Sequence, residues 1–344
     1  MPGYVLDGAG RVELPRRPLA VTVDATSTAV DVWAFGPDGT ESRHVLNPRP
    51  GLMILPRVDA ETVVVARPTQ QEEFPLGTIL YVTIGVDSER DPDPERAELT
   101  PIDVSGLYSI ELASVAPAGE RVAVTARKTA VDVALSEPAA RARSAARGVL
   151  RVDRLPEARR LRVELDIDTT MSMLPRIEDR SIRAVADVVA GIATVVGVRD
   201  AVQVNLIGRS VTTLPTGELR DLGDRVQAAL DSASLGVGFR SAALDRSSET
   251  ERTLVVSVSD AAPADRICDL GEASVVRRHH LVLSTTPTEP GAGITVVSPP
   301  NSGVAAGDSL LTESLLADPA YLRRIVESML SDIAAVRDSE GALK

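Results

Sequence analysis

A run of alternating apolar and charged residues ends in the segment Leu165-Asp166-Ile167-Asp168-Thr169-Thr170-Met171-Ser172-Met173. The alternation predicts a strand that ends at Asp168, with Thr170 and Ser172 following at spacings of two and four in the loop beyond it. Carboxylate and hydroxyl oxygens are hard ligands, suited to Mg²⁺ or Mn²⁺. Taken alone, the segment also fits a simple strand-to-helix turn in which Asp168 or Ser172 caps a helix.

Strand and helix patterns alternate from residue 161 to 337. Strands are predicted at 161–167, 201–207, 253–258, 281–285 and 294–297, and helices at 182–196, 219–230, 319–336 and, as a short turn, 241–244. This alternation predicts an α/β domain with a mostly parallel sheet covered on both faces, and ligands that bind beyond the carboxyl ends of its strands.

The first strand is unusual for the centre of such a sheet. Arg162, Glu164 and Asp166 alternate with Val163, Leu165 and Ile167, a period typical of a half-buried strand. We expect either that one face of the sheet is less covered or that these charges pair with neighbours.

Residues 160–337 resemble the von Willebrand factor A (vWA) family. The segment around Asp168 is similar to the Asp-x-Ser/Thr-x-Ser-Met motif that begins the metal-ion-dependent adhesion site (MIDAS) of that family. Gly236 to Leu244 resembles the later glycine-rich loop, although Phe239 stands where a Thr is expected, and Ser241 replaces it only if the loop shifts. Asp260, after an apolar run, resembles the last element, with Ser259 in place of Thr.

The resemblance implies a Rossmann-like α/β fold and a non-enzymatic function. In this family a bound Mg²⁺ or Mn²⁺ leaves one coordination position open, which an Asp or Glu of a protein partner fills. Carried over to this chain, the ligands are Asp168, Thr170, Ser172 and Asp260, with Ser241 a further candidate.

Residues 1–135 are rich in short apolar runs between turn signals and predict an all-β domain, a β-sandwich. The runs are 19–23, 30–35, 62–66, 79–84 and 122–125. Val21-Thr22-Val23-Asp24, the run Ala29 to Phe35 with the turn Gly36-Pro37-Asp38-Gly39, and the acidic stretch Asp87 to Glu98 resemble the TerD-type domain of bacterial tellurium-resistance and stress proteins.

The TerD-type resemblance implies Ca²⁺ bound by acidic loops. The candidate ligands are Asp24, Asp31, Asp87, Asp91 and Asp93. The stretch lacks the glycine that a tight calcium loop needs, so an exposed acidic loop is the simpler interpretation.

The two domains are separated by an Arg- and Ala-rich segment, 136–160, which we interpret as a solvated linker with at most a short helix or, less simply, an arginine-rich docking segment. The last residues, 338–344, are expected to be a disordered tail.

Composition excludes several function classes. The chain has 344 residues, a net charge of −12 and 2% aromatic residues, which disfavours nucleic-acid binding. It has no apolar run long enough to cross a membrane, and neither a signal peptide nor a P-loop is recognised, so a cytoplasmic location is expected. The single cysteine, Cys268, excludes an intrachain disulfide, and none of the three histidines lies in the motif segments.

These features together predict a protein–protein interaction module in a bacterial tellurium-resistance or general stress system. One alternative is a metal-free vWA scaffold, such as an adaptor for a chaperone-type AAA+ ATPase. A metal-dependent hydrolase is the least favoured, because it needs a general base near the ion.

Overall fold

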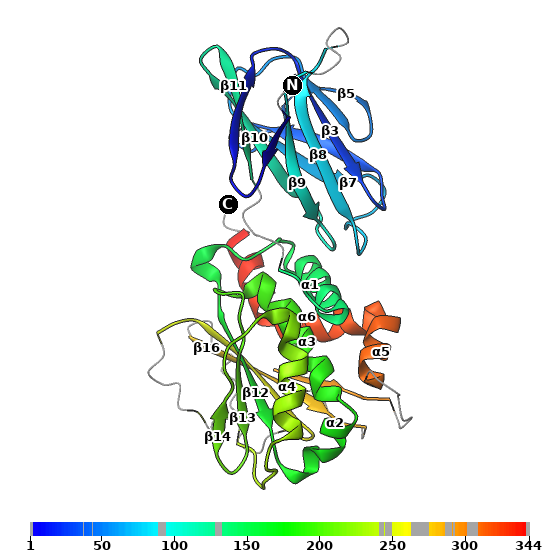
Figure 1. The fold of residues 1–344 in the computed structure, drawn as a ribbon, viewed down its shortest axis with the longest axis vertical. Helices are drawn as coiled ribbons and strands as arrows, with labels where there is room; N and C mark the ends of the chain where they lie inside the picture. The colour runs from blue at the N-terminus through cyan, green and yellow to red at the C-terminus, as the bar shows by residue number, and fades with distance from the viewer. Residues whose placement is uncertain are drawn as a thin grey trace. The chain divides into compact units, whose positions relative to one another are not determined.

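We analysed a computed structural model of the chain, shown in Figure 1. It describes residues 3–36, 38–42, 44–88, 94–127, 133–240, 244, 250–262, 275–285, 291, 293–300 and 309–341. The chain divides into two compact units, Met1–Asp132 and Val133–Lys344, which we treat separately.

The described residues of the first unit contain strands and no helix. Its strands are β1 (Gly3–Leu6), β2 (Arg11–Pro15), β3 (Leu19–Ala25), β4 (Val30–Phe35), β5 (Leu46–Arg49), β6 (Leu52–Leu55), β7 (Thr62–Pro68), β8 (Ile79–Val86), β9 (Arg96–Asp103), β10 (Ile110–Ala118) and β11 (Arg121–Ala126). All five runs predicted from the sequence fall on strands, here β3, β4, β7, β8 and β11.

These strands form two sheets, ordered β1-β9-β8-β3-β6-β5 and β2-β11-β10-β7-β4. Buried side chains of both sheets, including Leu14, Val21 and Ile84, join one hydrophobic cluster. The alternation of buried and partly exposed positions along β3 and β4 explains why each strand turns one face to this cluster.

The second unit alternates helices and strands. Its elements are α1 (Glu137–Leu150), β12 (Arg162–Asp168), α2 (Leu174–Glu178), α3 (Ser181–Val196), β13 (Gln203–Ile207), β14 (Val211–Thr213), α4 (Leu222–Asp231), β15 (Thr253–Ser259), β16 (Val276–Leu283), β17 (Ile294–Val297), α5 (Leu310–Ala317) and α6 (Pro319–Gly341). Three short 3-10 turns lie at 157–159, 171–173 and 219–221.

The six strands among its described residues form one mostly parallel sheet, ordered β14-β13-β12-β15-β16-β17, in which the edge strand β14 alone is antiparallel to its neighbour. Numbered within the unit, this order is 3-2-1-4-5-6, that of a doubly wound Rossmann-like sheet. The strand order reverses between β12 and β15, which is where such sheets bind their ligands.

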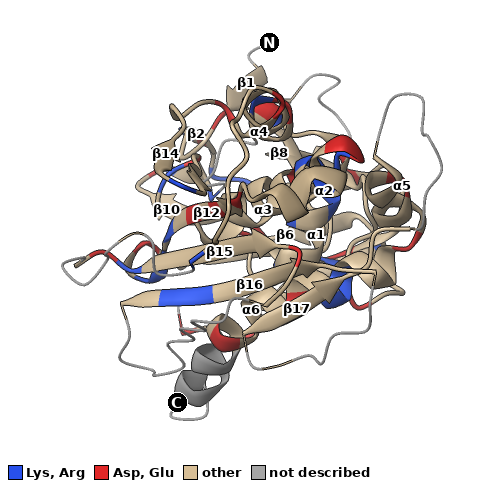
Figure 2. Ribbon diagram, turned by 90° about the horizontal axis from the view of Figure 1, so that it is seen from below, with Lys and Arg blue, Asp and Glu red and all other residues tan. Residues whose placement is uncertain are grey.

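The two faces of this sheet differ in polarity. Val163, Leu165 and Ile167 of β12 join a cluster to which helices α1 to α6 all contribute. On the opposite face Glu164 and Asp166 are almost completely buried, at 1% and 0% exposure. In Figure 2, β12 carries red acidic colour and β16 a blue basic section, in strands that are otherwise mostly tan.

The charges of β12 pair with neighbours, which is the second of the two alternatives expected. Arg162 lies 2.7 Å from Glu164 Oε1, and Asn205 on β13 donates to Asp166 Oδ1 at 2.8 Å. Thr213 on β14 donates in turn to Asn205 Oδ1 at 2.9 Å. A polar row therefore crosses three strands inside the sheet.

The segment predicted as a solvated linker is instead part of the second unit. Helix α1 buries Ala139, Ala142, Ala146 and Leu150 in the same cluster as α3. The prediction was wrong because it took the arginines of this segment to be solvated, whereas several are paired with carboxylates. Arg147, for example, is buried and lies 2.5 Å from Asp153.

The predicted tail is also shorter than expected, because helix α6 continues to Gly341. Strand β14 and helices α2 and α5 were not predicted, and the predicted short helix at 241–244 falls almost entirely outside the described residues. Over the described part of the chain, no helix is long and apolar enough to cross a membrane.

Helix α1 packs so closely on α3 that Gly191 has no room for a side chain. A Cβ at Gly191 would collide with the carbonyl oxygen of Ala139 and lie 2.8 Å from Ala142 Cβ. We expect Gly191→Ala to lower the free energy of unfolding by about 1–3 kcal/mol, measured by thermal unfolding. An exposed helical Gly→Ala change has the opposite sign, so a raised midpoint would show that α1 does not pack on α3.

A buried histidine joins two strands to α6. His279 on β16 is 5% exposed, and its Nε2 lies 2.8 Å from Thr295 Oγ1, which donates to Ser328 Oγ on α6 at 2.6 Å. Burial, with a smaller contribution from His280, lowers the pKa of His279 from 6.5 to about 4.

This shift predicts a pH-dependent stability. Between pH 6.5 and 4, His279 is protonated in the unfolded chain but stays neutral in the native protein. The free energy of unfolding therefore falls by about 3 kcal/mol as the pH is lowered through that window. His279→Gln should lack this component in urea unfolding at a series of pH values, whereas His44→Gln, at an exposed histidine, should retain it. Identical pH profiles for the wild type and His279→Gln would contradict the assignment.

Candidate functional site

The two aspartates singled out in the sequence end neighbouring parallel strands. Asp168 is the last residue of β12, and Asp260 directly follows β15. These strands pair in parallel from Arg162 and Thr253 to Ile167 and Val258. Both carboxylates therefore lie at the carboxyl edge of the sheet, at the point where the strand order reverses.

Backbone hydrogen bonds hold the loop after Asp168 between two other segments. Thr169 N–H donates to Ile207 O at 2.9 Å, at the end of β13. On its other side Gly236 N–H donates to Thr169 O, and Met171 N–H donates to Gly236 O. Gly208 has no room for a side chain unless the Thr169 side chain moves, because a Cβ at this position would collide with Thr169 Oγ1. The loop is thus fixed by contacts far apart in the sequence.

The hydroxyl residues lie beside the first carboxylate. Thr170 N–H donates to Asp168 Oδ1 at 2.8 Å, and Thr170 Oγ1 lies 3.0 Å from Ser172 Oγ. The hydroxyl of Ser259 donates to Ala261 O at 2.5 Å, which shapes the turn that carries Asp260. Asp168 and Thr170 are buried, Asp260 is half-buried and Ser172 is exposed, so the group is open to solvent on one side.

A shallow cavity of about 360 Å³ brings these residues together. Asp168, Thr170, Ser172 and Asp260, four of the predicted ligands, all line it. Phe239 lines it as well, so the residue at the expected Thr position presents a ring in place of a hydroxyl. Ser241, the remaining candidate ligand, lies outside the described residues.

The electrostatics of this cavity favour a cation. Burial raises the pKa of Asp168, the hydrogen bonds from Thr170 oppose this shift, and the nearby charge of Asp260 raises the pKa further. Two carboxylates that face one small space repel each other unless a positive charge or a proton lies between them.

The donor set fits a small hard ion. Mg²⁺ in proteins is typically held by one or two carboxylates, with waters completing six oxygens. Asp168 Oδ1 accepts from Thr170 N–H, which holds the carboxylate in place beside the two hydroxyls. Within the described ranges no group of three or more His, Cys, Asp and Glu side chains converges as a metal site, which leaves two carboxylates and two hydroxyls as the donors here.

The predicted calcium ligands of the first unit do not gather at one place. In the β3–β8 pair, Asp24 lies opposite Tyr81 at one end, and Asp87 follows Val86, which pairs with Leu19 at the other end. Asp87 is six residues beyond Tyr81, and at about 3.3 Å per residue this separates the two aspartates by roughly 20 Å, too far to share an ion. Asp31 lies on β4 in the other sheet. Asp91 and Asp93 lie outside the described residues, so calcium binding by that loop stays a prediction.

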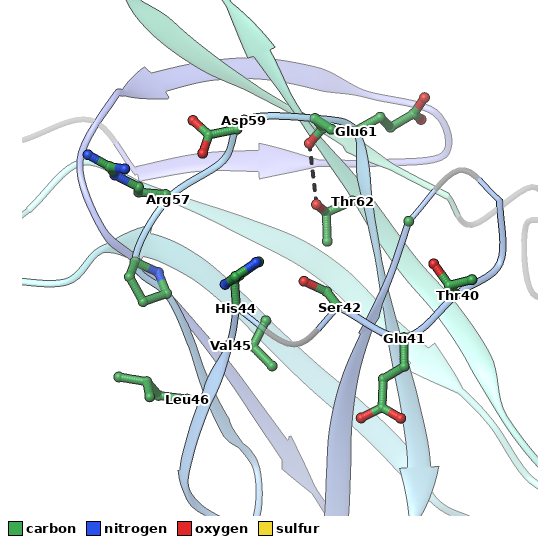
Figure 3. A pocket seen from close by; sticks show the side chains of 13 residues that line it. Thr40, Glu41, Ser42, His44, Val45, Leu46, Arg57, Asp59, Glu61 and Thr62 are labelled. Atoms are coloured by element: carbon green, nitrogen blue, oxygen red, sulfur yellow. Dashed lines mark hydrogen bonds between the residues drawn. The ribbon is translucent and has the colours of Figure 1, made fainter.

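The first unit has its own cavity, of about 1150 Å³ (Figure 3), near the exposed edge strand β5. Its walls carry both signs of charge, with His44 and Arg57 alongside Glu41, Asp59 and Glu61. Asp59 and Glu61 also pair with Arg16 and Arg127 outside its lining. The cavity therefore defines no single ligand chemistry, and none of the predicted calcium ligands lines it.

Sequence reasoning missed the part played by the segment around Gly236. It named this segment only as a degenerate glycine-rich loop, whereas its backbone forms a parallel bridge with Thr170 and lines the cavity. The signal present in the sequence was the pair Gly236 and Gly238, the second of which has a φ of 81° that favours glycine.

No family model matches this chain, and no curated protein matches it. Among solved structures, it is similar to the crystal structure of the ArnB paralog VWA2 from Sulfolobus acidocaldarius, at 12% sequence identity and a TM-score of 0.23. The match covers 77% of this chain and 44% of that chain. A TM-score this low is no basis for assigning a fold or a function.

The site makes a test by charge removal possible. Asp168→Asn keeps an acceptor for Thr170 N–H but removes the charge that burial and Asp260 disfavour. In EDTA we expect this variant to unfold at a higher temperature than the wild type. With Mg²⁺ at 100 times its dissociation constant, the wild type should gain about 2.7 kcal/mol and the variant much less. An equal Mg²⁺ shift in both proteins would place the ion elsewhere.

Proposed function

We propose that the second unit is a vWA-type domain that binds protein partners through a divalent ion held by Asp168, Thr170, Ser172 and Asp260. The observation that carries this proposal is the pair of carboxylates on two adjacent parallel strands, at the reversal of strand order, facing one cavity with two hydroxyls. Mg²⁺ or Mn²⁺ suits this donor set best.

The chemistry of the partner follows from the charge of the site. An Asp or Glu of a partner would be repelled by Asp168 and Asp260 alone, and it becomes a favourable ligand only with a cation between the groups. The exposed hydroxyl of Ser172 and the half-buried Asp260 leave the cavity open on the side from which a partner would approach.

Binding is favoured over catalysis by the lining of the cavity. A metal-dependent hydrolase needs a general base that can reach the attacking water. The described lining of this cavity contains no histidine, and its carboxylates are the proposed ligands themselves.

One observation favours a second candidate, a metal-free scaffold of the same fold. Phe239 places an aromatic ring where the family resemblance implies an oxygen ligand, which weakens the donor set. In that case the Asp168 side chain would either be protonated or be stabilised as a carboxylate by the hydrogen bond from Thr170 alone.

For the first unit, we propose a β-sandwich of the TerD type that serves as a second recognition module. Support comes from the sequence resemblance and from two sheets that share one hydrophobic cluster. The place of the whole protein in a bacterial tellurium-resistance or stress system rests on the sequence resemblance alone.

The open coordination position can be tested with Mn²⁺ and a peptide. Bound Mn²⁺ enhances water proton relaxation, and we expect N-acetyl-Gly-Asp-Gly-amide to lower this enhancement because its carboxylate replaces a water on the ion. The matched peptide with Asn in place of Asp should have no effect. Mn²⁺ binding no stronger to the wild type than to Asp168→Asn would favour the metal-free scaffold instead.

A further inference from the structure

A second cavity, of about 790 Å³, lies directly beside the candidate metal site. It is enclosed by the β13–β14 hairpin, the end of α4 and residues 232–237. Its walls include the aliphatic side chains of Leu206, Leu214, Ala229 and Leu235, among small hydroxyl residues. A lining of this kind suits a bulky aliphatic side chain.

The two cavities are adjacent and share part of their lining. Met171, Gly236 and Val237 line both of them, because the bridge between Thr170 and Gly236 runs between the cavities. On this bridge Met171 is 56% exposed and Val237 is 83% exposed. Two large apolar side chains left in solvent beside an apolar cavity are typical of an interaction surface.

One cation lies on the rim of this surface. Arg209 is exposed, lines the second cavity, and has its backbone N 3.3 Å from the position that a Cβ of Gly236 would take. Among the described residues we find no carboxylate paired with Arg209. In a chain with a net charge of −12, an exposed guanidinium here favours an acidic ligand.

We propose that this surface selects an acidic protein segment with a bulky aliphatic residue next to its metal-binding carboxylate. The carboxylate of the segment lies on the ion, the aliphatic side chain fills the second cavity, and a further acidic residue meets Arg209. The inference rests on the proposed function, since it names the kind of partner that the metal site takes.

The test uses the full chain and a displayed library of decapeptides with Asp fixed at one central position and the flanking positions random. Selection is carried out in Mg²⁺ with elution by EDTA. We expect Leu, Ile or Met at a constant offset from the fixed Asp, and a second acidic residue further along. Replacing the aliphatic residue of a selected peptide by Ala should weaken binding about 10- to 100-fold in fluorescence anisotropy.

Substitutions on the rim of the second cavity complete the test. Thr212 is exposed and lines the second cavity but not the one at Asp168, so Thr212→Glu should weaken binding of the selected peptide. Thr216→Glu, at an exposed residue outside the second cavity, should leave this binding unchanged. Arg209→Gln should weaken binding of the selected peptide about tenfold and remove the preference for the second acidic residue. Equal thermal midpoints in EDTA control for folding of the variants.

The possible failures differ from one another. Peptides that bind with Mg²⁺ but show no aliphatic preference, or that bind Thr212→Glu unchanged, overturn this inference and leave the metal site standing. A library without any Mg²⁺-dependent binder overturns both proposals. Dimerisation of the chain that Thr212→Glu abolishes would show that a second copy, and not an acidic segment, occupies the surface.

Discussion

The parallel pairing of β12 with β15 is the constraint on which the rest of the second unit depends. Asp168 and Asp260 meet because this pairing fixes their strands side by side in one register. A slip by one residue would turn Glu164 and Asp166 into the apolar cluster and Leu165 out of it. The hydrogen bond from Asn205 to Asp166 also holds only in the observed register. The polar row inside the sheet thus contributes to the specificity of the β12–β13 pairing, on the other side of β12 from β15.

Much of this could be predicted from the sequence, because strand ends and periodicity are local signals. The strand at 294–297 and the helix beginning at Pro319 match the structure, and Asp168 and Asp260 follow directly from where two strands end. What could not be predicted depends on tertiary contacts. The sequence of helix α1 is typical of a solvated segment, and only the structure shows that its arginines pair with Asp153 and Glu137. The pairing of Thr170 with Gly236 joins residues that no local pattern connects.

The first unit shows the opposite outcome for acidic residues. Asp24 lies near the carboxyl end of β3, and Asp87 follows the carboxyl end of β8. Because these two strands are antiparallel, their carboxyl ends lie at opposite ends of the strand pair. Asp168 and Asp260 come together because parallel strands end at the same edge. Sheet topology therefore decides which carboxylates in this chain can act on one ligand, and their number or spacing in the sequence does not.

The distribution of buried charge also bears on the choice between an ion site and an inert scaffold. Glu164 lies beside Arg162 and Arg147 lies beside Asp153, so these buried charges have a partner of opposite sign, and Asp166 accepts a hydrogen bond from Asn205. Asp168 differs, because over the described residues its hydrogen bonds come from Thr170 and the charge that acts on it is that of another acid, Asp260. Buried charges without a compensating partner are costly, and proteins tolerate them mainly where function requires them. A cation between Asp168 and Asp260 would supply the compensating charge that the buried ion pairs of this unit already have.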